Sequence, residues 1–260
     1  MLMQNERKIA NREELQVVIP VRIDSVERLR NLRLVLHDLS VMGIQVIVLE
    51  ADKRSHCSVL LSSFAFDYIF VEDDNEIFHR THYLNRLLHI CTAPVVGIWD
   101  TDVMLSKSQI EESLNAVLAE GYVFSSPYNG HFHFLTAQQS ITYATNPDTT
   151  FLHDCFPATL PFRQRASWGG AFLVDKKSYL QCGGENERFY GWGPEDVERV
   201  HRLEILGHPV HRANKALYHL WHPRGVNSFS ADAEMAFKNR MELIRICSMT
   251  REELECEVNT

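Results

Sequence analysis

Along the first hundred residues, short apolar runs typical of buried strands alternate with segments whose apolar residues have helical spacing. Four short runs are apolar enough for buried strands: residues 16–20, 44–49, 64–71 and 95–99. One helical face is expected between the first two runs, because leucines recur at 29, 32, 36 and 39, with Asp24 or Ser25 as the cap. A second helix is expected over residues 80–91. This alternation predicts an α/β fold with a mostly parallel central sheet covered by helices on both faces.

The rest of the chain continues the pattern less regularly. Further helices are predicted over residues 107–119, 195–206 and much of 231–260, and further strands over 122–125, 131–134 and 171–174. Residues 136–150 are rich in Thr, Ser, Gln and Asn, and they predict an irregular segment that is a candidate for a mobile or an acceptor-facing loop. The two histidines of residues 131–134 share one strand face. We favour solvent-facing side chains there over a metal pair. No repeat or linker divides the chain, so a single domain is expected.

Composition narrows the classes of partner. The formal net charge is −8 without an offsetting basic block, which argues against nucleic acid. No apolar run is long enough for a signal peptide or a transmembrane segment. Six scattered cysteines, without a C-x-x-C pair, favour free thiols in a reducing compartment. These features predict a cytoplasmic protein.

Polar residues stand at the carboxyl ends of the predicted strands. Arg22 follows the first strand, Glu50 ends the second, and Asp100-Thr101-Asp102 follows the strand at 95–99. Ligands of open α/β sheets bind beyond these ends, so the four charged side chains are expected to converge on one crevice. Carboxylates at a strand end suit a hard divalent cation such as magnesium or manganese.

The most distinctive stretch is GWGPED, residues 191–196. Its two glycines allow a turn that presents Trp192 outward. Pro194 suits the beginning of a helix, so Glu195 and Asp196 lie at a helix N-terminus. The helix dipole lowers the pKa of such carboxyls, whereas burial and a neighbouring carboxylate raise it, and the sequence does not decide between these effects.

Two further motifs flank that stretch. Gly169-Gly170 precedes a predicted strand, where paired glycines allow a ligand to approach the backbone. His219-Leu220-Trp221-His222 supplies two imidazoles that, together with Asp102, favour metal binding over ordinary packing.

Together these motifs resemble GT-A fold glycosyltransferases, nearest to the β-1,4-galactosyltransferase group with its C-terminal domain and to bacterial family-two-like enzymes. The resemblance covers residues 16–225 and is most specific over 169–222. It implies a lead-in at residues 1–15, a GT-A domain at 16–230 and a helical segment at 231–260. Within the domain, residues 16–105 would be the nucleotide-binding half and 106–230 the acceptor and metal half.

The resemblance also implies residue roles. Nucleotide-sugar contacts would come from Pro20, Arg22, Glu50, Phe78, Arg80, Asp100, Asp102, Gly169, Gly170 and Trp192. Asp196 would be the catalytic base beside Glu195, and the acceptor would contact Trp192, Gly193 and Asp196. The metal, manganese by preference and magnesium as the alternative, would be held by Asp102, His219 and His222.

This chain departs from the family pattern at four places. Asp24 stands where a second arginine is common, Val197 replaces an acceptor-binding acid, Pro194 replaces a glycine, and His219 replaces a methionine ligand. These departures leave the identities of the sugars open.

The activity that the resemblance implies is inverting transfer of a hexose or N-acetylhexosamine from a UDP-sugar to a glycan or lipid-linked glycan. A role in bacterial surface polysaccharide synthesis, in the cytoplasm or peripherally at the inner membrane, follows from the family. Two alternatives stay open: a sugar-nucleotide nucleotidyltransferase and a non-catalytic binding module. Residues 223–232 are a hypothetical lid.

Overall fold

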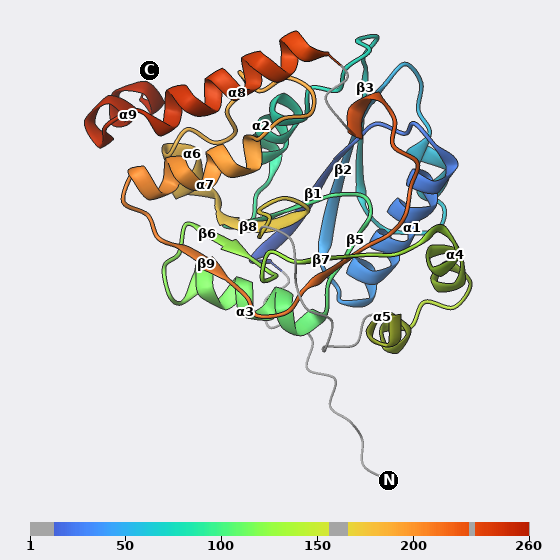
Figure 1. Cartoon of the computed structure of the whole chain (residues 1–260). Coiled ribbons are helices and arrows are strands. Elements are labelled where there is room, and N and C mark those ends of the chain that lie inside the picture. Colours follow the sequence, from blue (N-terminus) through green and yellow to red (C-terminus); the bar gives the residue numbers. More distant parts are fainter. Residues whose placement is uncertain (1–12, 156–165, 229–231, 260) are drawn as a thin grey trace.

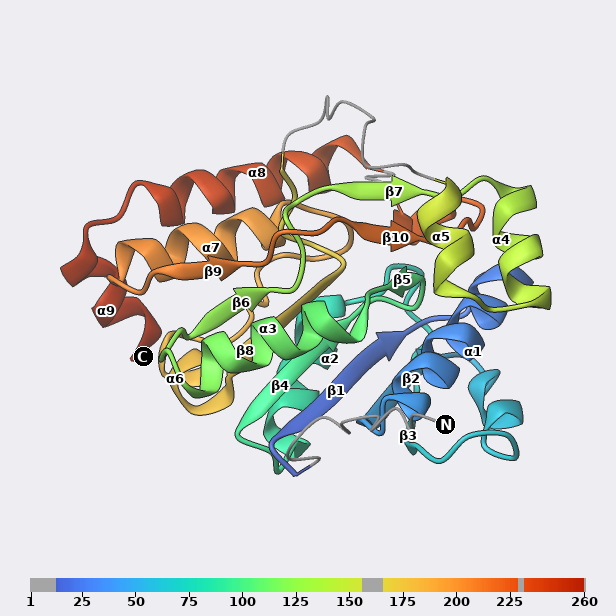
Figure 2. The ribbon, with the colours of Figure 1, turned by 90° about the horizontal axis from the view of Figure 1, so that it is seen from below.

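The computed structural model describes residues 13–155, 166–228 and 232–259, and it shows a central sheet between two layers of helices (Figures 1 and 2). The strand order in the main sheet is β3-β2-β1-β4-β8-β6-β9. Their bounds are β1 (Leu15–Val21), β2 (Gln45–Asp52), β3 (Asp67–Glu72), β4 (Val95–Trp99), β6 (Phe124–Ser126), β8 (Ala171–Asp175) and β9 (Val210–Arg212). Only β8 runs antiparallel to its neighbours, so the predicted mostly parallel α/β fold is confirmed.

Alternating side chains of the buried strands serve two cores. In β1, Val17 and Ile19 face one core and Val18 faces the other, and all three are fully buried. Burial of each such side chain contributes roughly 1.5–3 kcal/mol. The first core is covered by α1 (Val26–Val41) and α3 (Lys107–Leu118). The second is covered by α2 (Arg80–Ile90), α6 (Lys176–Gln181), α7 (Glu195–Ile205), α8 (Ala233–Cys247) and α9 (Arg251–Val258).

A second, three-stranded sheet lies beside the first core. It consists of β5 (Val103–Met104), β10 (Leu217–His219) and β7 (Phe132–Phe134), in that order. Strand β5 follows Asp102 directly, and β10 pairs with it in antiparallel register. This small sheet therefore joins the middle of the chain to its C-terminal third next to the D-x-D motif.

Several local predictions are confirmed by the caps. Ser25, not Asp24, caps α1 by accepting a hydrogen bond from the amide of Arg28. Thr250 and Glu253 form a capping box at the beginning of α9, within the predicted helical region 231–260. Gly207, at φ 86°, follows the end of α7, in agreement with the helix predicted over residues 195–206. All six cysteines are free thiols.

Two predictions about local structure are wrong. Residues 136–150 are largely helical: α4 (Ala137–Thr145) begins with a Thr136–Gln139 capping box, and α5 (Thr149–Cys155) follows. The polar composition reflects the exposure of α4, whose Ser140 and Tyr143 alone are buried. Strand β2 also extends to Asp52, so Glu50 lies inside the strand, not at its end.

The outer parts of the chain fall partly within the described residues. The lead-in at 1–15 is described only from residue 13, and the hypothetical lid at 223–232 only through Ser228 and from residue 232. The 3-10 turn Val226–Ser228 lies before that gap. Among the described helices, none is both long enough and apolar enough to cross a lipid bilayer.

Candidate active site

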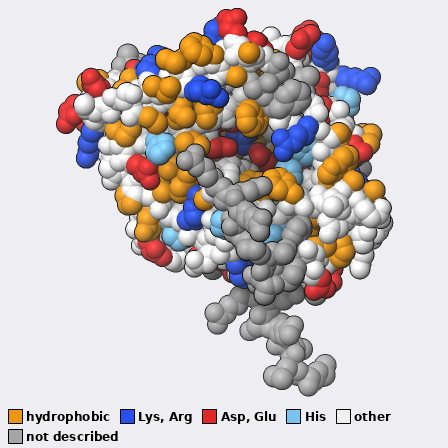
Figure 3. All heavy atoms as spheres, in the orientation of Figure 1, with side chains coloured by type: hydrophobic (Ala, Val, Ile, Leu, Met, Phe, Trp, Pro, Cys, Tyr) orange, Lys and Arg blue, Asp and Glu red, His pale blue; other side chains and the backbone are white. Residues whose placement is uncertain are grey.

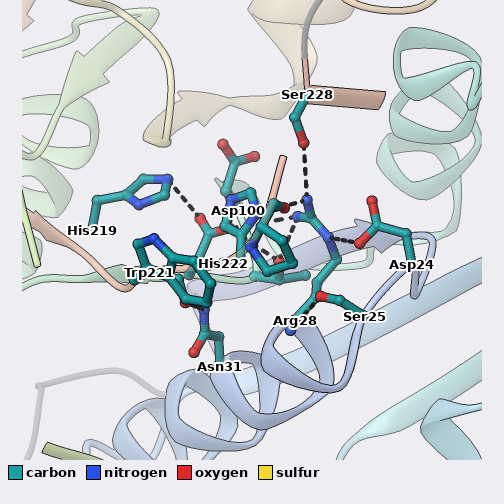
Figure 4. Close-up of polar contacts among 12 residues, drawn as sticks. Asp24, Ser25, Arg28, Asn31, Asp100, His219, Trp221, His222 and Ser228 are labelled. Carbon is teal, nitrogen blue, oxygen red and sulfur yellow. Dashed lines mark hydrogen bonds and ion pairs between the residues drawn. The ribbon is translucent and has the colours of Figure 1, made fainter. Parts of the chain in front are cut away.

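The pairing of β5 with β10 brings the D-x-D motif to the C-terminal histidines. His219 lies opposite Val103 in this register, and the amide of Leu220 donates a 2.8 Å hydrogen bond to the carbonyl of Asp102. The next residue, Trp221, donates its amide to Ser140 Oγ, and its carbonyl accepts from Asn31 Nδ2 at 3.1 Å. Helices α1 and α4 therefore hold the backbone that carries His222. Figure 4 shows Asn31 of α1 beside Trp221 and His222.

Asp102, His219 and His222 converge on one point. Nε2 of His219 lies 3.4 Å from Oδ1 of Asp102, and Nε2 of His222 lies 3.2 Å from Oδ2. One ligand atom from each residue lies within 4.8 Å of the others. One carboxylate and two imidazoles at this separation form a donor set that fits manganese and related divalent ions. The structure thus brings together all three residues predicted as metal ligands.

The charged residues of this metal group shift one another's pKa values. Burial acts to raise the pKa of Asp102, but His219, His222 and Arg28 outweigh it and hold that pKa well below its usual range. Burial acts to lower the pKa of His222, but the hydrogen bond to Asp102 outweighs it and raises that pKa. Asp102 is therefore a carboxylate at neutral pH, the form that binds metal.

Arg28 of α1 extends into the metal group and was missed by the sequence reasoning. Its NH1 lies 3.5 Å from Asp102 Oδ2 and 3.3 Å from Thr101 Oγ1, and its Nε donates to Asp24 at 2.9 Å. Its NH2 contacts Ser228 Oγ at 3.3 Å, so the guanidinium links α1 to the turn at 226–228 (Figure 4). The spacing Asp24–Arg28 is an i, i+4 pair, which was the available signal.

A second charged group contains the proposed catalytic carboxylates. Arg80 NH2 lies 2.8 Å from Oδ1 of Asp100. Burial acts to lower the pKa of Arg80, but the charges of Asp100, Asp196 and Glu195 outweigh it and raise that pKa. Asp196 Oδ1 pairs with Arg199 NH1 at 2.9 Å. Arg80 was predicted to contact uridine, and the structure places it among these carboxylates.

At Glu195, burial and the helix dipole have opposite effects on the pKa of the carboxyl. Burial raises the pKa of Glu195 to about 8, with Asp196 adding to the rise and Arg80 opposing it. Within the described part of the chain, its buried Oε2 has no hydrogen-bond partner. Burial therefore outweighs the helix dipole at Glu195 and favours its protonated form near pH 7.

The paired glycines lie directly against the motif carboxylate. A Cβ on residue 169 would overlap Oδ2 of Asp196, so a side chain there would displace the carboxylate. Gly170 has φ 87°, a conformation that favours glycine, and its carbonyl accepts from the amide of Asp100 at 2.8 Å. The pair therefore connects the D-x-D motif to Asp196 through backbone contact.

The GWGPED loop is held by a residue of helix α8. Asn239 of α8 is buried, and its Nδ2 donates to the carbonyls of Tyr190 at 3.0 Å and Trp192 at 3.2 Å. A Cβ on Gly193 would lie 2.7 Å from the same Nδ2. The indole of Trp192 stays 53% exposed, as predicted. Acidic side chains gather in a central hollow of this face, with apolar side chains above it (Figure 3).

A cavity of about 450 Å³ lies at the ends of β1, β2 and β3. Its lining residues are Arg22, Asp52, Lys53, Asp73, Asn75, Glu76 and Ile77. Asp73 holds Arg22 at 2.6 Å and accepts from the hydroxyl of Tyr83 at 2.8 Å. Phe78 stacks on Tyr83 with ring centroids 5.3 Å apart. The guanidinium of Arg22 also lies over the ring of Phe78, 5.5 Å from its centroid, so two residues predicted to contact the nucleotide are neighbours. Asp73 was not singled out from the sequence.

Two predicted nucleotide contacts lie inside β-strands. Glu50 is 0% exposed, and its carboxylate accepts hydrogen bonds from the amides of His56 and Cys57 and from the hydroxyl of Tyr68. Pro20 is buried inside β1, before its carboxyl end. The expectation that Glu50 converges on the crevice with Arg22 is therefore wrong, because β2 ends at Asp52 and Glu50 anchors the loop that follows.

Part of this chain is similar in sequence to known galactosyltransferases. The family model described as the N-terminal domain of galactosyltransferase matches residues 151–224. Human β-1,4-galactosyltransferase 7 is 29% identical over 35% of this chain and 32% of the human protein. The mouse protein is 28% identical over the same shares. The chain thus matches about a third of the length of these curated relatives.

Solved structures share the fold over most of the chain. Glucosyl-3-phosphoglycerate synthase from Mycobacterium tuberculosis, in complex with Mn²⁺, UDP and phosphoglyceric acid, has a TM-score of 0.59 at 13% identity, covering 91% of this chain and 79% of that chain. The catalytic domain of Drosophila β1,4-galactosyltransferase 7, in complex with xylobiose, has a TM-score of 0.50 at 15% identity, with 91% and 81% covered. These likenesses confirm the predicted GT-A fold. The family model and the curated relatives confirm the resemblance to the β-1,4-galactosyltransferase group.

Proposed function

We propose that this chain is a metal-dependent, inverting glycosyltransferase. It transfers a hexose or N-acetylhexosamine from a UDP-sugar to a hydroxyl of a glycan or lipid-linked glycan. The observation that carries the proposal is the convergence of Asp102, His219 and His222 on one point. The similarity to human and mouse galactosyltransferases and the fold shared with a UDP- and Mn²⁺-bound synthase support it.

The donor occupies the edge formed by β1 to β4. The cavity beside Arg22 has a volume typical of small-molecule sites, and we assign the nucleotide to it, with Phe78 nearby. Asp102, His219 and His222 hold the cation, with manganese preferred over magnesium. When bound, the cation neutralises charge on the departing diphosphate. Arg28 adds a second positive charge there, in place of the family arginine that Asp24 replaces.

Asp196 acts on the acceptor. Oδ2 of Asp196, which faces Gly169, takes the proton of the acceptor hydroxyl. The hydroxyl oxygen of the acceptor bonds to the anomeric carbon as it loses this proton. The bond from the anomeric carbon to the diphosphate oxygen breaks in the same step, and its electron pair leaves with UDP. Because the attack comes from the face opposite the leaving group, the anomeric configuration inverts. Trp192 offers an apolar surface to the sugar rings.

The cellular setting follows from the resemblance to bacterial family-two-like enzymes. We assign the enzyme to bacterial surface polysaccharide synthesis, working in the cytoplasm or peripherally at the inner membrane. Phosphoglycerate is tested beside the glycan acceptors, because the synthase with a similar fold was solved with phosphoglyceric acid. Val197 stands where an acceptor-binding acid is common in the family, which favours an acceptor other than that of the galactosyltransferases.

The test begins with thermal shift of the purified chain against UDP, GDP, CMP and dTDP, each with and without Mn²⁺. Stabilisation by UDP only with Mn²⁺ is expected, followed by turnover in a panel of UDP-sugars with glycan and phosphoglycerate acceptors. Asp196→Asn should keep the UDP shift and lose turnover. No shift with any nucleotide would refute the donor site. Binding without turnover, unchanged in Asp196→Asn, would establish a non-catalytic module. Formation of UDP-sugar from UTP and sugar phosphate would establish the nucleotidyltransferase.

A further inference from the structure

One buried arginine contacts the candidate base and takes no part in the mechanism above. Arg199 lies one helical turn after Asp196 in α7, and its side chain is only 1% exposed. Its NH1 donates to Oδ1 of Asp196 at 2.9 Å. Its guanidinium lies over the ring of Phe172, 4.2 Å from the centroid. The packing against β8 therefore fixes the direction from which this cation approaches Asp196.

The other side of Arg199 is fixed just as firmly. Its Nε and NH2 donate to the two oxygens of Glu185 at 3.0 and 2.7 Å, a bidentate arrangement. Glu185 is buried, and it also accepts from the hydroxyl of Tyr179 at 2.7 Å. The chain Tyr179–Glu185–Arg199–Asp196 thus runs from α6 to the site through buried groups.

The two carboxylate oxygens of Asp196 have different surroundings. Oδ1 is held by Arg199, and Oδ2 is directed at Gly169, where the described residues provide no hydrogen-bond partner. Arg80 is a competing cation, because its charge also acts on Asp196 and Glu195. Without Arg199, the carboxylate would be free to rotate about χ1 and χ2 toward Arg80, and Oδ2 would leave its position.

We propose that Arg199 is a positioning residue that orients the Asp196 carboxylate for proton transfer. The inference rests on the proposed function, in which Asp196 is the base. It assigns to Glu185 and Tyr179 the role of holding Arg199 in place. General-base catalysis depends on geometry first, and a displacement of about 1 Å can cost on the order of 100-fold in rate.

The chain offers a matched control for the test. Arg202 lies in the same helix, is equally buried, pairs with Glu198 at 2.8 Å and donates to the carbonyls of Cys182 and Gly184. Its described hydrogen bonds and ion pair do not include Asp196, so its replacement removes a buried ion pair without touching that carboxylate. Arg199→Lys and Arg202→Lys should therefore lose similar stability and differ in catalysis.

We expect Arg199→Lys to lower kcat by about 10- to 100-fold while the KM for the donor changes less than about twofold. The double variant Arg199→Met with Glu185→Gln removes both buried charges and so tests the role without an unpaired ion. It should lower kcat at least as far and still show the UDP and Mn²⁺ thermal shift. Equal kcat losses in Arg199→Lys and Arg202→Lys, or wild-type kcat in the folded double variant, would overturn the proposal.

A second readout separates this inference from the proposed function. If the wild-type chain shows no turnover, the function fails, and crystal structures of Arg199→Lys and Arg202→Lys decide about Arg199. The carboxylate of Asp196 should be rotated away from Gly169 in the first variant and unchanged in the second. An unmoved carboxylate in both would refute the positioning role.

Discussion

Oδ2 of Asp196 stands in the space that a side chain on residue 169 would need. Gly169 is therefore required by a contact with the candidate base, not by its backbone conformation, since only its neighbour Gly170 has a positive φ. This contact connects the loop before β8 to the first turn of α7, two segments that are separated by more than twenty residues in sequence.

Replacement of Gly169 by alanine should therefore damage catalysis more than stability. The methyl group must push the Asp196 carboxylate aside, so we expect kcat to fall by about 100-fold. The Tm should change by only a few degrees. Steady-state kinetics and thermal unfolding check this. The control is Gly207→Ala at the far end of α7, where φ is 86° and the nearest atom is the flexible Arg251 end. It should lose stability by about 1 kcal/mol and keep kcat.

The two histidines should contribute separately to metal affinity. His219→Ala and His222→Ala each remove one imidazole from the group around Asp102, so each should weaken Mn²⁺ binding by at least about 10-fold. Titration of Mn²⁺ in the presence of UDP, followed by calorimetry, measures this. His201→Ala removes an exposed imidazole of α7 and should bind Mn²⁺ like the wild type. Equal Mn²⁺ affinity in all three variants would contradict the metal site.

Asn239 should control the acceptor side of the site. Asn239→Leu keeps a similar volume but loses the hydrogen bonds to the carbonyls of Tyr190 and Trp192. We expect the acceptor KM to rise about 5- to 10-fold, because each lost hydrogen bond costs roughly 1 kcal/mol in holding the loop. The affinity for UDP with Mn²⁺ should stay the same. Lys238→Ala, on the exposed face of α8, serves as the control. A changed UDP affinity with an unchanged acceptor KM would contradict this role.

Asp38 should make stability depend on pH. Burial raises the pKa of Asp38 from 3.8 to about 7, so the ionised form of this carboxyl destabilises the folded state. Between pH 4 and pH 7 the unfolded chain releases this proton while the folded chain keeps it, and stability falls as pH rises. Above pH 7 the whole cost is present. Asp38→Asn should therefore stabilise the fold by up to about 4 kcal/mol at pH 8 and by almost nothing at pH 4.

Chemical denaturation at both pH values tests the Asp38 prediction. Asp67→Asn, at an exposed position at the beginning of β3, is the control and should show no pH-dependent gain. The same gain at pH 4 and pH 8 would mean that Asp38 acts through something other than its charge.

The sequence alone determined the class of the fold and most of the metal group. Hydrophobic periodicity located the main strands and helices, because burial on two faces leaves a strong local pattern. The D-x-D motif, the GWGPED loop and the late histidines were recognisable because each is a short run of unusual residues. Helix α4 was missed because its polar, exposed surface produces little apolar periodicity.

Only the tertiary structure decided how these pieces act together. Asp102 meets His219 and His222 through the pairing of β5 with β10, more than a hundred residues apart. Arg28, Asp73, Arg199 and Asn239 become functional candidates only by contact, because each belongs to an ordinary helix or loop in the sequence. Glu50 was misjudged because β2 runs on to Asp52. Local pattern reports which face of an element is buried, whereas the partner of a charged side chain is set by packing between distant segments.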